Sequence, residues 1–298
     1  MRIVLIGARG QLGTDLLPRL QERHDVVPLG HMDIELTDAS AAERVLGNAE
    51  PDFVINAAAY NFVDQAEDEP DVAFAVNGLG PRNLALFCGG RDIPLLHISS
   101  DHVFGQDADR TTPYLETDCP GPVSAYAVSK LAGEYFVRGL CQRHFVVRTC
   151  GLYGHAALDG GGKGNFVETM FRLGTEKDSL RIVDDQCCTP TATSDLARAI
   201  ALLIETQSYG LYHATNGGST TWCGLAREIF RIADIDVAVT PITSEEFDAK
   251  ARRPHYSVLD TTRLTTTIEA EFPDWQAALK TYIDGRSTAT ADHESDSP

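Results

Sequence analysis

The feature of this sequence that most constrains its fold is a glycine-rich turn close to the N-terminus. A short apolar run, Arg2–Ile6, leads directly into Gly7, and further glycines follow at positions 10 and 13. An apolar run that glycine closes predicts a buried strand, and the residues after Gly10 suit a helix. A strand that turns through glycines into a helix presents backbone N–H groups to an anion. Residues 7–13 are therefore predicted to bind a phosphate group, with a plain strand–helix turn as the alternative.

The same alternation of short apolar runs and helical stretches continues through the first half of the chain. Strands are predicted at 2–6, 26–29, 53–56, 95–99 and 145–148, and helices near 11–23, 39–48, 70–89 and 124–142. The runs are continuously apolar, as burial on both faces of a parallel sheet requires. The expected fold class is α/β: a Rossmann-type doubly wound parallel sheet with a smaller, mostly C-terminal substrate domain.

The rhythm of strand and helix breaks after residue 148. A loop is expected over the glycine-rich 159–164, helices over 165–174, 194–205, 222–233 and 273–284, and a strand over 211–214. We therefore predict a dinucleotide-binding domain at 1–150, to which part of 186–214 returns. The substrate domain is predicted at 151–185 and 215–285. Residues 286–298 hold no large apolar side chain and are expected to be a disordered tail.

Charge and cysteine content exclude several classes of protein. The net charge is −18, so a nucleic-acid partner is not expected. No apolar run is long enough to span a membrane, and the first one is too short for a signal peptide. The seven cysteines are odd in number and form no CxxC pair, which argues against a disulfide framework and a zinc site. We expect a cytoplasmic protein without a bound metal.

The residues that follow the second predicted strand bear on the choice of dinucleotide. An acid at this point binds the ribose hydroxyls of NAD, and a base favours NADP. Here the sequence reads Leu29-Gly30-His31, while Arg9 lies inside the glycine turn. A guanidinium can bind a 2′-phosphate with two hydrogen bonds. NADPH is therefore the expected cofactor, with NADH left open and a solvated Arg9 as the alternative.

Three residues of the first half suggest acid–base chemistry at a carbonyl group. Tyr126 and Lys130 lie one helical turn apart on one face, and a nearby cation lowers the pKa of a phenol. Ser100 ends the fourth predicted strand, at the sheet edge where such folds bind ligands. The alternatives are a surface Tyr–Lys pair and a plain turn serine. Together with a dinucleotide turn, Ser100, Tyr126 and Lys130 indicate hydride transfer to or from a carbonyl.

In this order the motifs resemble the extended short-chain dehydrogenase/reductase superfamily, to about residue 285. Four stretches narrow the resemblance to the dTDP-4-dehydrorhamnose reductases. These are Asn56–Tyr60 with Val63–Glu67, Ser100–Phe104 beside the family's STDYVF, the DDQxxxPT stretch from Asp184 to Thr191, and Arg252–Asp260 beside its RRPxxSxLD. The last two stretches are specific to the family rather than to the superfamily.

The resemblance implies reduction of dTDP-4-dehydro-L-rhamnose to dTDP-L-rhamnose, with a role for each matched residue. Tyr126 would protonate the C4 oxygen, Ser100 would bind the same oxygen, and Lys130 would hold the nicotinamide ribose and lower the pKa of Tyr126. Asp101 and Arg253 would contact the substrate, Arg253 at its diphosphate. The residues implied along the cofactor are Gly7, Arg9, Gly10, Gln11, Leu12, Gly13, Glu35, Leu36, Ala58, Ala59, Tyr60, Tyr126 and Lys130.

Two departures from the family pattern leave alternatives open. Gly151 stands where the family's RTSWVYG has a substrate-contacting Trp, and Glu35 is a longer acid than the usual one. Another NDP-sugar reductase or epimerase of the same fold therefore remains an alternative. So does a non-catalytic NADP-binding subunit like the regulatory subunit of methionine adenosyltransferase. The sequence leaves the oligomeric state open, with a homodimer as one alternative.

Overall fold

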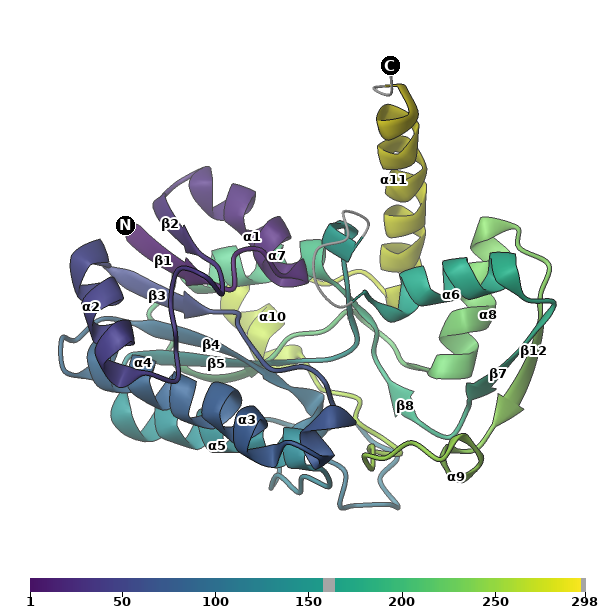
Figure 1. Cartoon of the computed structure of the whole chain (residues 1–298), viewed down its shortest axis with the longest axis horizontal. Coiled ribbons are helices and arrows are strands. Elements are labelled where there is room, and N and C mark those ends of the chain that lie inside the picture. Colours follow the sequence, from purple (N-terminus) through teal and green to yellow (C-terminus); the bar gives the residue numbers. More distant parts are fainter. Residues whose placement is uncertain (158–163, 296–298) are drawn as a thin grey trace.

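The computed structural model describes residues 1–157 and 164–295, and a six-stranded parallel sheet forms its centre (Figure 1). The strand order is β10-β5-β4-β3-β1-β2. Their bounds are β1 Arg2–Ile6, β2 Asp25–Leu29, β3 Phe53–Asn56, β4 Leu95–Ser100, β5 His144–Thr149 and β10 Gly210–His213. The predicted parallel α/β sheet is confirmed, and each predicted strand lies within one residue of an observed one at either end. No helix of the described ranges is both long enough and apolar enough to cross a membrane.

Helices cover both faces of the sheet, so successive strand residues enter two separate cores. Ile3 and Leu5 of β1 pack with helices α1 (Gln11–Gln21) and α7 (Thr193–Leu203). Val4 and Ile6 point the other way, toward α2 (Ala39–Ala49), α4 (Gly80–Gly89) and α5 (Ala125–Leu140). Helix α10 (Thr262–Ile268) joins the first core through Leu264. This two-sided burial is the reason for the continuously apolar strands.

The helix predicted over 70–89 is present, but its middle is π-helical and not α-helical. It consists of α3 (Pro70–Phe74), a π-helical turn η2 (Ala75–Leu79) and α4. A π turn inserts an extra residue into the helix and re-aims the side chains around it. Asn77 of this turn is buried.

A smaller body lies beside the sheet (Figure 1). Its core joins α6 (Phe166–Glu176), α8 (Trp222–Ala233) and α11 (Trp275–Ser295) to β7 (Ser179–Val183), which pairs in parallel with β12 (Ala238–Ile242). The predicted domain boundaries remain a prediction. The short elements are η1 (Gln65–Glu67), η3 (Asp101–Val103), β6 (Leu152–Tyr153), η4 (His155–Ala157), β8 (Cys187–Cys188), β9 (Thr191–Ala192), β11 (Thr220–Thr221) and α9 (Ser244–Phe247).

The C-terminal segment differs from the expected disordered tail, because α11 continues to Ser295. Its first part is buried through Leu279, Tyr282 and Ile283, and Arg286 pairs with Glu168 of α6 at 3.0 Å. The helix then extends out of the body (Figure 1). Anchoring of the first turns nucleates the helix, and each further residue then adds a hydrogen bond. Residues 296–298, and most of the loop expected at 159–164, lie outside the described residues.

A buried ion pair lies between the sheet and α5. Arg148 of β5 donates to both carboxylate oxygens of Glu134, from Nε at 2.8 Å and from a terminal nitrogen at 2.7 Å. Neither side chain is more than 1% exposed. Ser99 of β4 also donates to Glu134, at 2.6 Å. One carboxylate therefore joins α5 to two neighbouring strands of the sheet, β4 and β5.

Replacing Glu134 by Gln is expected to lower the free energy of unfolding by about 3–5 kcal/mol, because the Arg148 charge then stays buried without a counter-ion. Denaturant unfolding followed by circular dichroism measures the change. Glu176→Gln is the matched control, since it removes an exposed pair with Arg172, worth less than about 0.5 kcal/mol. Equal small shifts in both variants would contradict the expected dependence of Arg148 on Glu134.

Candidate functional site

The glycine turn has the geometry of a phosphate cradle. Gly7 adopts φ +81°, and a Cβ atom there would lie 2.7 Å from the backbone nitrogen of Ala58. A Cβ on Gly13 would overlap the carbonyl oxygen of Gly7, so a larger residue fits at neither place. Gly10 precedes α1 and caps it with no side chain. No side chain therefore caps the N-terminus of α1, and a helix N-terminus of this kind is suited to bind a diphosphate.

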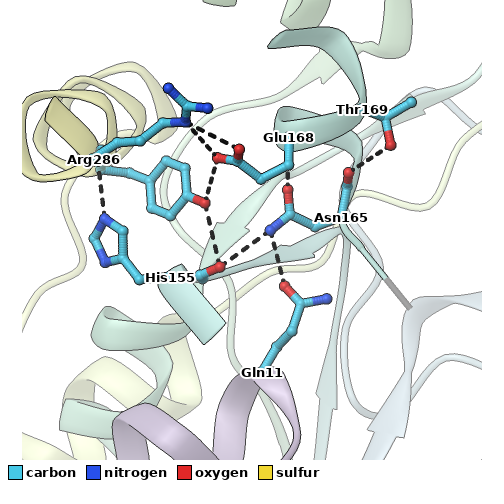
Figure 2. Close-up of polar contacts among 8 residues, drawn as sticks. Gln11, His155, Asn165, Glu168, Thr169 and Arg286 are labelled. Atoms are coloured by element: carbon cyan, nitrogen blue, oxygen red, sulfur yellow. Dashed lines mark hydrogen bonds and ion pairs between the residues drawn. The ribbon is translucent and has the colours of Figure 1, made fainter. Parts of the chain in front are cut away.

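A polar network ties this turn to the smaller body, as Figure 2 shows. Asn165 donates to Oε1 of Gln11 at 3.0 Å, and its own side-chain oxygen caps α6 by accepting from the N–H of Glu168 at 2.9 Å. The Glu168 carboxylate accepts from the Tyr282 hydroxyl at 2.8 Å and from Arg286. The turn is thus held by α6 and α11. The sequence analysis missed this network, although an Asn just before a helix is a recognisable N-cap.

The structure brings Ser100, Tyr126 and Lys130 together at the carboxyl edge of the sheet. Ser100 ends β4, and Tyr126 lies in the first turn of α5, where Ser124 caps the helix. The Ser100 hydroxyl lies close enough to the Tyr126 phenol to affect its pKa. All three side chains are buried, and Lys130 donates to the carbonyl of Ile98 at 2.7 Å. The grouping matches the sequence prediction of adjacent hydroxyl, phenol and ammonium groups.

The electrostatics of the phenol differ from the sequence expectation. Burial raises the pKa of Tyr126 to about 12, and the opposing effect of the Ser100 hydroxyl is smaller. Burial also lowers the pKa of Lys130 to about 8, against the favourable charge of Glu134. The predicted lowering of the Tyr126 pKa by Lys130 is absent here, because the ammonium is turned to Ile98. A phenol with this pKa keeps its proton at neutral pH and is able to donate it.

Asp101 lies directly behind Ser100 and is buried. One of its carboxylate oxygens accepts from the Ser100 hydroxyl at 3.1 Å, and the other accepts from the Ser257 hydroxyl at 2.6 Å. His102, at the place of a tyrosine in the family motif, lies edge-on to the Tyr126 ring, with 5.6 Å between centroids. Burial lowers the pKa of His102, which favours the neutral imidazole.

The end of β2 contains an acid that the sequence analysis overlooked. Asp33 turns back so that its carboxylate accepts from the N–H of Gly30 at 2.7 Å and lies 3.9 Å from Arg9. An acid therefore does stand at the strand end, beside the predicted 2′-phosphate ligand. Glu35 binds Thr37 through its carboxylate, which lowers the pKa of Glu35, and Leu36 is buried beneath it.

Residues 58–60 are connected to α5 through the π turn. The side-chain oxygen of Asn77 accepts from the N–H of Tyr60 at 2.9 Å, and its NH₂ donates to the Tyr60 carbonyl and to Ser129 at 3.0 Å. Asn56 similarly accepts from the N–H of Ala58 at 3.1 Å. The predicted cofactor segment, which includes Ala59, is thereby positioned next to the helix that carries Tyr126. Pattern analysis missed Asn77, because its role depends on the π turn.

Arg253 does not extend into open space. Its two terminal nitrogens donate to the two carboxylate oxygens of Asp64, at 3.0 and 2.7 Å. The Ala251 N–H donates to the same carboxylate at 3.0 Å. Asp64 therefore balances the charge that was expected to meet a diphosphate, and it holds the segment around Arg253 against the loop after β3.

Gly151 follows β5 with φ +53°, and a Cβ atom there would lie 3.6 Å from the Trp222 ring. Trp222 begins α8, and its indole N–H donates to Gln186 at 3.2 Å. An indole from a distant part of the chain thus stands beside the position where the family's Trp is missing. Among the described residues, no group of His, Cys, Asp and Glu could hold a metal ion.

The chain matches the family model described as RmlD substrate binding domain over residues 1–287. It is 41% identical to a dTDP-4-dehydrorhamnose reductase of Streptomyces griseus, over 93% of this chain and 91% of that protein. It is 40% identical to a probable dTDP-4,6-dihydroxy-2-methyloxan-3-one 4-ketoreductase of Streptomyces antibioticus, over 94% of each chain. The crystal structure of dTDP-4-dehydrorhamnose reductase from Bacillus anthracis in complex with NADP is similar at a TM-score of 0.89 and 38% identity, covering 95% of this chain and 99% of that one. The expected resemblance is confirmed.

Arg9→Ala is expected to weaken NADPH binding by about 10- to 150-fold and NADH binding little, since a charge-assisted hydrogen bond to the 2′-phosphate is lost. Fluorescence titration with each dinucleotide measures the two dissociation constants. Asp33→Asn is the matched variant at the other end of the pair. It removes the charge facing a 2′-phosphate and should tighten NADPH relative to NADH. Equal losses for both cofactors in Arg9→Ala would contradict the assignment of Arg9.

Proposed function

This chain belongs to the RmlD family of dTDP-4-dehydrorhamnose reductases, and we propose that it reduces the C4 keto group of dTDP-4-dehydro-L-rhamnose to give dTDP-L-rhamnose, with NADPH as the reductant. The observation that carries the proposal is the grouping of the buried side chains of Tyr126, Ser100 and Lys130 at the same sheet edge as the glycine turn. A carbonyl that receives a hydride must also receive a proton, and Tyr126 is the group that holds one.

In this proposal the chain supplies the proton and the orientation. Bound NADPH provides the hydride. Tyr126 donates its phenolic proton to the C4 oxygen, Ser100 binds that oxygen, and Asp101 lines the substrate pocket behind it. Lys130 leaves the Ile98 carbonyl to bind the nicotinamide ribose, where its charge stabilises the tyrosinate that remains.

The residues proposed to hold the dinucleotide lie on three neighbouring loops. The turn residues Gly7, Gly10, Gln11, Leu12 and Gly13 would bind the diphosphate through backbone N–H groups. Arg9 would bind the 2′-phosphate, and Glu35, Leu36, Ala58, Ala59 and Tyr60 would lie along the cofactor. Asp33 beside Arg9 is suited to a ribose hydroxyl, so we propose that NADH is accepted as a weaker second cofactor.

Gly151 supports a second candidate, the reduction of a different dTDP-sugar ketone by the same chemistry. The position has no side chain of its own to contact a sugar, and the Trp222 ring lies beside it instead. The Streptomyces antibioticus relative is named for a ketone other than dehydrorhamnose. We also propose a cytoplasmic location, because the seven cysteines are free and reduced thiols persist in that compartment. A homodimer is proposed as the assembly.

Purified protein mixed with NADPH and dTDP-4-dehydrorhamnose should consume the nicotinamide absorbance, and Tyr126→Phe should reduce the rate by about 10²- to 10⁴-fold with unchanged NADPH binding. Other dTDP-4-keto sugars, assayed in parallel, test the second candidate. Binding of NADPH without turnover of any of these sugars would contradict the reductase and support the non-catalytic NADP-binding subunit.

A paired test addresses the proposed diphosphate contact of Arg253. If Arg253 leaves Asp64 to bind the diphosphate, Arg253→Leu should raise the Kd of the sugar nucleotide about 10-fold or more. Asp64→Asn should then leave that Kd unchanged or lower it, because it frees the guanidinium. Isothermal titration calorimetry of both variants measures the two Kd values. If the Arg253–Asp64 pair only anchors the segment, both variants should raise the Kd to a similar extent.

A further inference from the structure

A chain of hydrogen bonds leads from Ser100, beside the catalytic phenol, to a residue far away in the sequence. Ser100 lies next to Tyr126. It donates to one oxygen of Asp101 at 3.1 Å, and Ser257 donates to the other at 2.6 Å. Each of the four side chains is at most 7% exposed. Water therefore cannot easily replace a lost partner, and each bond restricts the orientation of the next group.

The directions of these bonds place Ser257 at the far end of the series of hydrogen bonds. Both serine hydroxyls donate to the Asp101 carboxylate, one to each oxygen. The Ser100 oxygen accepts from the N–H of His102 at 3.2 Å. The rotamer of Ser100 thus depends on where Asp101 places its carboxylate, and Ser257 holds the second oxygen of that carboxylate.

The backbone around Ser257 is held from two sides, so its hydroxyl is a firm support. The Ser257 N–H donates to the Cys187 carbonyl at 2.9 Å, and the Cys187 N–H donates to the His255 carbonyl at 2.7 Å. Upstream, Asp64 holds Ala251 and Arg253. The segment 251–257 is therefore anchored both to β8 and to the loop after β3.

From these contacts we infer that Ser257 is a positioning residue for the reduction: it orients Asp101 and, through it, the Ser100 hydroxyl that faces Tyr126. This inference rests on the proposed function for its kinetic consequences. Ser257 contacts none of the reacting atoms in the proposed reduction. Its contribution is the placement of the oxygen-binding hydroxyl, and misplacement by a fraction of an ångström to one ångström is enough to slow a reaction strongly.

The test is Ser257→Ala beside Ser257→Thr, which keeps the hydroxyl. We expect Ser257→Ala to lower kcat about 10- to 100-fold, with the NADPH Kd and the unfolding midpoint close to those of the unaltered chain. Ser257→Thr should recover most of the rate. Ser244→Ala is the matched control, because it removes a Ser–Asp bond of the same 2.6 Å length, to Asp185, and should keep kcat. An unchanged kcat in Ser257→Ala overturns the inference.

Two further readouts separate positioning from a general structural effect. On an Asp101→Asn background, Ser257→Ala should cost little more, since both act through one carboxylate, and a full additive loss overturns the inference. A crystal structure of Ser257→Ala should show the Asp101 carboxylate turned away from Ser100. An unmoved Asp101 overturns the inference whether or not the chain reduces the proposed sugar, so this readout is independent of the proposed function.

Discussion

The buried ion pair between Arg148 and Glu134 is the interaction on which the rest of this structure depends. It joins β5 to α5, takes a third bond from Ser99 of β4, and lies one helical turn below Lys130. The Glu134 charge favours the ammonium form of Lys130, while burial opposes it. An ion pair placed so deep contributes little net stability compared with apolar packing. Its effect is to specify how α5, with Tyr126 and Lys130, sits on the strand ends that carry Ser100.

Much of the sheet was predictable because its sequence signals are local. Apolar runs such as Arg2–Ile6 are buried on both faces, so neither face needs polar residues and the pattern is unambiguous. The grouping of Ser100, Tyr126 and Lys130 followed from two local facts, a strand end and a helical spacing. In a parallel sheet all strands end at the same edge, which brings such residues together.

What the sequence left hidden depends on contacts between distant segments. Asp33 escaped notice because it lies beyond the strand end and returns to it only through its bond to Gly30. The pairing of Arg253 with Asp64 joins positions 189 residues apart. The raised pKa of Tyr126 results from burial, which no spacing reveals. The C-terminal helix is longer than its composition predicts. Tyr282 and Arg286 anchor it to α6, and composition does not reveal such tertiary contacts.

The course of segment 251–257 has a consequence for how the protein is made. All strands of the sheet, the glycine turn and helix α5 have been synthesised once β10 has left the ribosome, whereas Ser257 and helix α11 follow later. Chains fold during synthesis from the N-terminus onward. A nascent chain can thus pair its strands before the glycine turn is supported from α11 and before the Ser100–Asp101 pair is supported by Ser257. The contacts that fix both halves of the proposed site are therefore among the last that the growing chain can form.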